Sequence, residues 1–355
     1  MKLFGRKEKS TGEILAGGEN AIANKEVEGL SQGQIVRRRF FRHRAAVIAL
    51  GVITTIILFV MTALDTKLGP IRIPGWWKWT VEDIPELRFE DCPGGTTGCP
   101  TLSLNPAGDF GLGNHPFGQD DIGRDYFALV MNGARRSLMI MFVIGAVSGF
   151  IGVVVGSISG FYGKRVDAVL MRLVDFIQTV PTIIIAAVIG KAAGRVGPLF
   201  LALFLGILGW TGLARLVRAQ FLSLREMEFV DAARVAGASN IRIAFKHILP
   251  NAIGQIIVSV TLIMAGAILT ETALSYLGFG VVAPDVSLGL LISQYESSFT
   301  TRPWLFWWPG LFIIIIALCV NFIGDGLRDA FDPRQRRRIT KKDRLQAKLQ
   351  IKAGE

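Results

Sequence analysis

The sequence predicts an all-α membrane protein that crosses the bilayer six times. Of its 355 residues, 51% are hydrophobic and only 19% are charged, against roughly 25% charged in an ordinary soluble domain. The apolar residues fall in runs close to the 20 or so residues that a bilayer-spanning helix needs. This composition excludes a disordered chain, and the 3 cysteines are too few for a disulfide-rich secreted scaffold.

Six apolar runs give the predicted spans. They are residues 45–64, 138–161, 169–190, 196–213, 252–274 and 305–323. Pro181 interrupts the third run, and because proline lacks the amide hydrogen that a helix interior uses, we expect a kinked helix there. The predicted division is a cytoplasmic N-terminal tail (1–44), a first peripheral helix (45–64), an extracytoplasmic loop (65–137), a core (138–323) with a long loop at 214–251, and a basic C-terminal tail (324–355).

Charge predicts the orientation, because Lys and Arg are retained on the cytoplasmic side of a membrane. With the N-terminus inside, 29 Lys and Arg residues fall inside and 10 outside, so we expect both termini in the cytoplasm. Lys191 and Arg195, in a short outside loop, are a local exception. Most tryptophans fall in or beside outside segments, as an interfacial aromatic belt requires: Trp76, Trp77, Trp79, Trp304, Trp307 and Trp308.

Two basic blocks, 37–44 and 334–338, each adjoin a span. That position favours contact with anionic lipid headgroups over contact with nucleic acid. The first block also resembles a twin-arginine export signal, but a full span follows it without a small-residue cleavage site. We therefore interpret it as an orientation signal.

The outside loop contains Cys92 and Cys99, separated by a Pro/Gly-rich turn. Outside the membrane such a pair favours a disulfide, because the turn lets the two sulfurs approach; two unpaired thiols in a loop are the alternative. Cys319 lies in the last span, where we expect a packing residue.

The second span carries a stripe of glycines at spacings of 4, 3, 4 and 4, which puts them on one helical face. They are Gly145, Gly149, Gly152, Gly156 and Gly160. Such a stripe lets another helix approach closely. A substrate path along it is the alternative interpretation.

Charged residues within the spans are few. Asp175 and Glu271 are the acids in question, and neither has an obvious relay partner, which disfavours an ion-coupled secondary transporter. Glu271 lies near the end of its span, so we expect it to anchor a neighbouring helix or loop rather than contact a substrate. No segment fits the phosphate-binding pattern G-x-x-x-x-G-K-[ST], so this chain is not expected to bind ATP itself.

The inside segment 228–250 has the signals of two short helices. Gly237 suits a helix C-terminus, Ser239 or Asn240 a new N-cap, and Pro250 the end of the second helix. Two short helices at a sharp angle would form a knob with small residues on its surface, suited to a groove on a partner protein. An ordinary amphipathic loop on the membrane surface is the alternative.

This segment resembles the loop of permease subunits of ATP-binding-cassette importers, with its pattern Glu-Ala-Ala, a glycine four residues on, and a terminal Leu-Pro. Asp231 replaces the glutamate and keeps its charge; Ala232-Ala233, Gly237 and Leu249-Pro250 match. Residues 115–125, 271–280 and 321–333 are similar to the dipeptide, oligopeptide and nickel branch, in its second-permease (C-type) subunit.

The resemblance implies the type I importer transmembrane fold, with this loop as the coupling helix that docks on an ATPase. The implied coupling residues are Glu228, Asp231, Ala232, Ala233, Gly237, His247, Leu249 and Pro250. The implied partners are a homologous second permease, two cytoplasmic ATPases that bind ATP and Mg²⁺, and an external substrate-binding protein. No catalytic residue, metal or cofactor is expected on this chain. The favoured cargo is a short peptide rather than nickel or another small solute.

One stretch contains metal-ligand residue types: His115, Asp120, Asp121 and Asp125. We predict a structural turn there instead, because His-Pro-Phe-Gly is typical of a turn and Arg124 can pair with the carboxylates. A secondary transporter and a non-transporting membrane scaffold remain the alternatives from other functional classes.

Overall fold

A computed structural model of the chain describes residues 32–68, 71–87, 92, 96–102, 111 and 113–331. The helices are α2 (Gln32–Arg42), α3 (Arg44–Ala63), α4 (Tyr126–Tyr162), α5 (Lys164–Thr179), α6 (Thr182–Val196), α7 (Pro198–Gly209), α8 (Thr211–Leu224), α9 (Glu228–Val235), α10 (Asn240–Arg242), the π-helix η2 (Ile243–Ile248), α11 (Leu249–Tyr276), α12 (Leu288–Tyr295), the 3-10 helix η3 (Glu296–Ser298) and α13 (Trp304–Phe331). One antiparallel hairpin, β1 (Thr66–Leu68) with β2 (Ile71–Ile73), lies in the predicted outside loop. The all-α prediction is confirmed apart from this hairpin. The basic block 334–338 lies outside the described residues.

Four helices are long and apolar enough to cross a membrane alone: α3, α4, the continuous helix Asn240–Tyr276, and α13. Two pairs meet the same criterion together, namely α5 with Thr182–Gly190 of α6, bent by 70°, and α7 with α8, bent by 42°. The described residues therefore give the predicted six spans when each bent pair makes one crossing.

Both bends have local causes. Val180 is extended (φ −93°, ψ 128°), as expected for a residue that precedes proline, so the kink predicted at Pro181 is a complete break between α5 and α6. In the other pair, the Ser148 hydroxyl of α4 donates to the Gly206 carbonyl over 2.8 Å. This bond lies within one turn of the bend, and a side chain that hydrogen-bonds to a carbonyl of the helix ladder is a common cause of a kink.

The helix that contains the predicted second span (138–161) begins earlier in the chain than that span. Helix α4 begins at Tyr126, and the Asp125 side chain caps it by accepting from the Ala128 amide. Arg135 and Arg136 interrupt the apolar run and so shortened the predicted span. Arginine is nevertheless a good helix former, and the helix continues through both residues.

Helices also extend into the segments predicted to be the two tails, 1–44 and 324–355. Phe40 of α2 is buried beside Ala330 near the end of α13, and Val36 and Leu327 pack against them. Helix α2 and the last turns of α13 are amphipathic, so each has one apolar face and one charged face. A search for unbroken apolar runs does not detect such a face.

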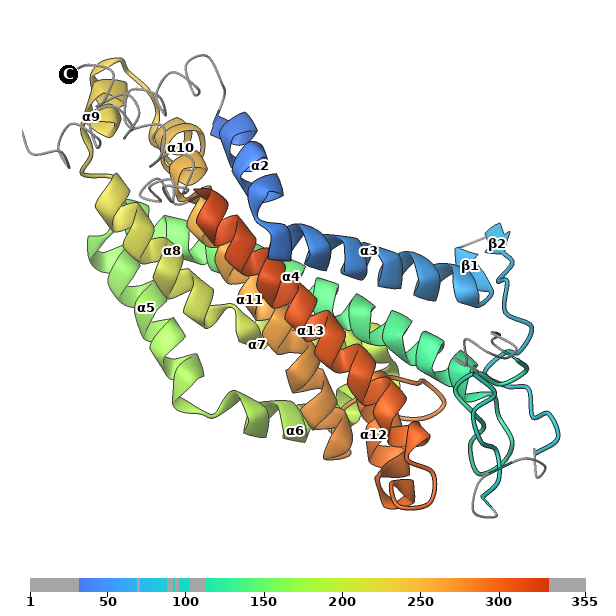
Figure 1. The fold of residues 1–355 in the computed structure, drawn as a ribbon. Helices are drawn as coiled ribbons and strands as arrows, with labels where there is room; N and C mark the ends of the chain where they lie inside the picture. The colour runs from blue at the N-terminus through green and yellow to red at the C-terminus, as the bar shows by residue number, and fades with distance from the viewer. Residues whose placement is uncertain are drawn as a thin grey trace, which may run out of the picture.

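Helix α4 lies at the centre of the bundle, where it packs against α7, α8 and α11. Figure 1 shows α2, α9 and α10 gathered at one end and the β1–β2 hairpin at the other. The end that carries α9 and α10 is the one predicted to face a partner.

Glu271 connects three helices near the other end of α11. Its fully buried carboxylate accepts from the hydroxyls of Ser275 (2.7 Å) and of Ser137 on α4 (3.0 Å). The Ser137 oxygen in turn accepts from the Leu288 amide at the start of α12 (3.2 Å). A buried acid within a span needs such partners. This geometry gives Glu271 the anchoring role that its position predicted.

Candidate functional site

The segment that resembles a coupling helix is a short helix held to the bundle by the buried Val230 and the partly buried Phe229 and Ala233. Val230 is the buried residue of α9, and it lies in an apolar cluster with Val217 and Phe221 of α8 and with Ile243 and Ile248 of η2. The rest of α9 is largely exposed. A helix of 8 residues is too short to be stable in water alone, so its position depends on this anchor and on the turn that follows.

The turn after α9 is a Schellman motif. Gly237 has a left-handed backbone (φ +75°), its amide donates to the Arg234 carbonyl (2.9 Å), and the Ala238 amide donates to the Ala233 carbonyl (3.0 Å). These bonds satisfy carbonyls that the end of a helix leaves unpaired. The predicted helix end at Gly237 is thus observed, with a backbone conformation that glycine adopts without strain.

The predicted end of the second helix at Pro250 is wrong. Ser239 is the N-cap, as predicted, but Asn240–Tyr276 then runs as one continuous helix. Within η2 the Leu249 amide donates to the Ala244 carbonyl five residues earlier. This wide turn relieves the clash between a proline ring and the carbonyl four residues before it. Pro250 lies in the first turn of α11, where its missing amide hydrogen is tolerated.

The predicted coupling residues divide into two groups. Glu228, Asp231, Ala232, Gly237 and Pro250 are exposed, whereas Ala233, His247 and Leu249 are partly buried. Of these three, Ala233 and Leu249 pack against the apolar cluster around Val230. Asp231 pairs with Arg234 on the helix surface, with Oδ1 and Nη1 3.1 Å apart. The exposed group can contact a partner, and the second group holds the segment in position.

Three large apolar side chains that the pattern did not single out are exposed on the same segment. Val235 is 90% exposed, Ile241 68% and Phe245 55%. Their exposure leaves apolar surface on this segment that a partner protein could cover. No local signal in the sequence separates these residues from buried ones such as Ile243.

The five glycines of α4 lie against neighbouring helices. A Cβ atom at Gly145 or Gly149 would meet α11 side chains, at Met264 and Val260 respectively. At Gly152, Gly156 and Gly160 it would meet α8, at Leu213, at the Ala214 carbonyl (2.6 Å) and at the Arg218 carbonyl (2.7 Å). The stripe therefore lies in two helix contacts of the chain itself. This position supports the packing interpretation over a substrate path.

At the opposite end, Cys92 and Cys99 form a disulfide. Two residues beside it contact other parts of the molecule: Thr97 Oγ1 accepts from Arg302 Nη2 (2.7 Å), and the Gly98 carbonyl accepts from the Gln119 amide (2.8 Å). The disulfide thus holds a loop that connects the outside segment to the start of α13.

We expect loss of this disulfide to lower the stability of the outside segment by about 2 kcal/mol, the usual cost of opening a loop of this length. The measurement is thermal unfolding of the purified protein with and without reductant. Reductant should lower the Tm of the wild type and leave the Cys92→Ser/Cys99→Ser double variant unchanged. Equal shifts in both proteins would contradict the prediction.

The residues with metal-ligand chemistry form a structural turn, as predicted. Arg124 Nε donates to Asp120 Oδ2 (2.6 Å), and Asp125 accepts from Trp77 Nε1 (2.7 Å) while lying 2.9 Å from His115 Nδ1. Tyr295 donates to the same Asp120 oxygen, and burial together with that carboxylate raises the pKa of Tyr295 well above its usual range. Within the described residues no group of three or more acidic, His or Cys side chains is arranged to hold a metal.

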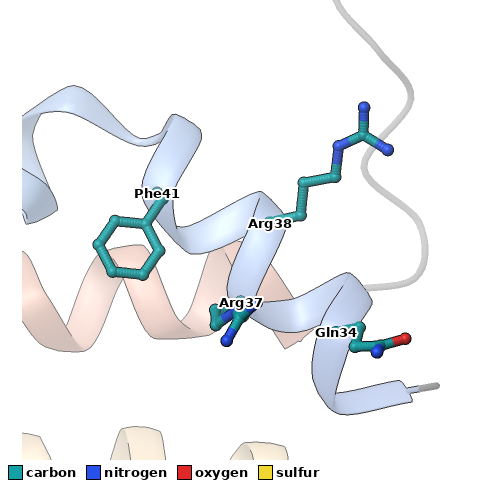
Figure 2. Close-up of a pocket in the computed structure, with 4 residues that line it drawn as sticks. All are labelled: Gln34, Arg37, Arg38 and Phe41. Atoms are coloured by element: carbon teal, nitrogen blue, oxygen red, sulfur yellow. The ribbon is translucent and has the colours of Figure 1, made fainter. Parts of the chain in front are cut away.

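The basic helix α2 has a shallow surface hollow of about 330 Å³, lined by Gln34, Arg37, Arg38 and Phe41. Figure 2 shows Arg37 and Arg38 pointing in different directions, so their guanidinium groups do not converge on one ligand. Phe41 is 59% exposed beside them. Exposed arginines together with an exposed aromatic ring are typical of a helix at a membrane surface.

The chain is similar to membrane components of known transport systems. Residues 152–337 match the family "Binding-protein-dependent transport system inner membrane component", and residues 31–66 match "N-terminal TM domain of oligopeptide transport permease C". The chain is 37% identical over 318 residues to the oligopeptide transport system permease protein OppC of Escherichia coli K12, covering 90% of this chain and 96% of that one. It is 36% identical to OppC of Mycobacterium tuberculosis H37Rv, covering 87% and 97%. A solved structure of the MetNI methionine ABC transporter is also similar, with 19% identity and a TM-score of 0.47 over 57% of this chain and 96% of that chain.

Proposed function

The chain belongs to the family of binding-protein-dependent transport system inner membrane components, and we propose that it is the C-type permease subunit of an ATP-driven importer of short peptides. It is a transport subunit and not an enzyme; ATP hydrolysis belongs to separate subunits. The observation that carries the proposal is the short helix α9, which is anchored on the bundle by Val230, is otherwise largely exposed and is followed by the Gly237 turn.

In this proposal α9 docks on a cytoplasmic ATPase. Closure of the ATPases moves α9, and the Schellman turn passes that displacement to the continuous helix Asn240–Tyr276. Because this helix also holds Glu271, movement at one end reaches α4 and α12 at the other end. The two permeases then alternate between inward and outward openings, and nucleotide shifts the balance between these states.

The remaining partners follow from the same proposal. A homologous second permease completes the passage, and an external binding protein delivers the peptide to the side that carries the disulfide. Both termini lie in the cytoplasm, and α2 rests on anionic lipid headgroups through its exposed arginines. A short peptide is favoured over nickel because similar proteins from Escherichia coli and Mycobacterium tuberculosis are named for oligopeptide transport.

The test is co-purification of the tagged chain from native membranes in mild detergent, followed by mass spectrometry. We expect a second permease and two ATPases to be recovered with it, and ATP hydrolysis by the complex to rise when the binding protein and a peptide are added. Recovery of the chain alone, from membranes in which other multisubunit complexes stay intact, would contradict the proposal. Uptake that fails with an uncoupler while ATP stays high would favour an ion-coupled transporter.

A further inference from the structure

Three segments that are far apart in the sequence meet at the outside end of the bundle. They are the irregular stretch 80–87, the turn 119–125 that leads into α4, and the turn 296–302 that leads into α13. In the first segment exposed and partly buried residues alternate, so every second side chain is exposed. The segment therefore lies along the surface of the protein.

Polar contacts join the three segments to one another. The Gln119 side chain donates from Nε2 to the Glu86 carbonyl (3.0 Å), which connects the first segment to the second. Arg302 Nη1 donates to Asp121 Oδ1 (2.5 Å), which connects the second to the third. Arg302 also donates to Thr97, beside the disulfide. A surface that is already held in one arrangement loses little conformational entropy when a partner binds to it.

Large apolar side chains on all three segments are exposed. Ile84 is 62% exposed, Ile122 56% and Phe299 46%. The two isoleucines are neighbours, because a Cβ at Gly123 would lie 3.7 Å from Ile84 Cγ2. Phe299 belongs to the turn that contains Arg302, the residue bonded to the second segment. A partner that covers these side chains removes apolar surface from water, which is the main favourable term in protein association.

The apolar side chains lie among exposed carboxylates, and the nearby basic groups are engaged. Arg302 is bonded to Asp121 and its side chain is only 18% exposed. Lys78, which precedes the first segment, donates to Asn114 Oδ1 (2.6 Å). This part of the surface is therefore acidic. We call its six exposed residues the outer patch: Glu82, Ile84, Glu86, Asp121, Ile122 and Phe299.

The charge of the outer patch favours one kind of partner. Anionic lipid headgroups repel carboxylates, so a membrane surface is a poor partner for the patch. A protein that presents basic side chains around an apolar contact complements it in both respects. Because a disulfide is stable in an oxidising environment, the partner is expected outside the cytoplasm.

We propose that the outer patch is the surface on which the external substrate-binding protein docks, through an apolar contact surrounded by basic side chains of that protein. The inference rests on the proposed function and adds to it the contact surface and the charge of the partner. Asp125, at the end of the second segment, caps α4, and the third segment leads into α13. Docking on the patch therefore contacts the permease beside the outside ends of two spans.

The first test is ATP hydrolysis by the complete complex in lipid nanodiscs, at increasing concentrations of the binding protein loaded with trialanine. The Ile84→Ser/Ile122→Ser variant should need a roughly tenfold higher concentration for half-maximal stimulation, because it loses central apolar contacts of the interface. The maximum should stay within about twofold, because saturating binding protein restores docking. Both side chains are exposed, so the fold should not depend on them.

The matched control is Ile73→Ser in β2. It removes an isoleucine that is 47% exposed and lies outside the outer patch. The half-maximal concentration should equal that of the wild type.

A second measurement tests the charge of the patch. The Glu82→Gln/Glu86→Gln variant should need an about threefold higher half-maximal concentration at about 50 mM salt, and a much smaller increase at about 300 mM, because salt screens the attraction in the wild type. An equal salt dependence in the wild type and the variant would overturn the inference.

The outcomes separate this inference from the proposed function. Absence of stimulation of the wild type by the loaded binding protein would contradict the proposed function itself. Stimulation with the same half-maximal concentration in the wild type and in Ile84→Ser/Ile122→Ser would overturn the inference alone. A lowered maximum without a shift in that concentration would place the patch in a step after docking and also overturn it.

A third test measures whether the patch is free until the binding protein arrives. Ile84→Cys should react with a membrane-impermeant maleimide in the complex alone, and the binding protein should protect it. The natural cysteines do not compete, because Cys92 and Cys99 are joined and Cys319 is buried. No reaction in the complex alone would mean that lipid or another subunit covers the patch. Equal reaction with and without the binding protein would mean that docking occurs elsewhere, and either result would overturn the inference.

Discussion

Replacement of Gly237 by isoleucine is expected to abolish ATP-driven peptide uptake while the ATPases stay attached to the complex. Gly237 has φ +75°, and an L-residue in this left-handed region costs roughly 1–2 kcal/mol, with β-branched residues worst. The space around the residue is open, since a Cβ would have no atom within 4 Å. The effect is therefore conformational: the Schellman turn is lost, and α9 no longer moves together with the helix that begins at Asn240.

Two further variants test whether the loss of uptake comes from the backbone conformation at Gly237 or from the bulk of the isoleucine side chain. Gly237→Asn should retain much of the uptake, because asparagine tolerates the left-handed region better than other residues with a Cβ. Gly51→Ile in α3 also places isoleucine in open space, but at a glycine without a positive φ, and should leave uptake unchanged. The measurement is peptide uptake and ATP hydrolysis by reconstituted complexes. Normal uptake with Gly237→Ile would refute the assignment of this turn to coupling.

The parts of this site that could be predicted have strong local signals. Gly237 and Ser239 define a helix end and a new cap through their own backbone and side-chain chemistry, and the structure has both. Pro250 gave an equally clear signal and was misleading. The structure accommodates Pro250 with a π-turn at 243–248. The stability of such a turn depends on the packing of Ile243 and Ile248 as well as on the proline.

The parts that could not be predicted depend on residues far apart in the sequence. Asp175 had no obvious partner in the sequence, because Arg215 lies 40 positions away and on another helix. The exposure of Val235 and Phe245 follows only from the way α9 and η2 lie on the bundle. The start of α4 was missed because Arg135 and Arg136 resemble the end of a span, although an arginine pair is compatible with a helix that extends beyond the hydrocarbon layer.

Replacement of Gly156 by leucine should have the largest effect on stability. Gly156 lies where α4 crosses α8, and a Cβ there would be 2.6 Å from the Ala214 carbonyl oxygen and 2.7 Å from the Val217 Cβ. Backbone and Cβ atoms cannot rotate away as the end of a flexible side chain can. The helices must therefore separate, which would expose the buried residues between them. We expect little folded complex to be recovered, measured as monodisperse protein after purification from equal amounts of membrane.

Alanine variants at two positions of the same stripe test whether a glycine is needed for close helix packing or can be replaced by a better helix former. In a soluble helix alanine is favoured over glycine by about 1 kcal/mol. At Gly149 the nearest atom to a new Cβ is a Val260 methyl at 3.2 Å, which can shift, so Gly149→Ala should keep the Tm near or above that of the wild type. At Gly156 overpacking costs typically 1–3 kcal/mol and outweighs the helix preference, so Gly156→Ala should lower the Tm. Equal Tm values for the two alanine variants would mean that α8 can move away from α4 at little cost. The stripe would then be a sliding contact, of the kind that alternation between inward and outward openings requires, rather than a fixed one.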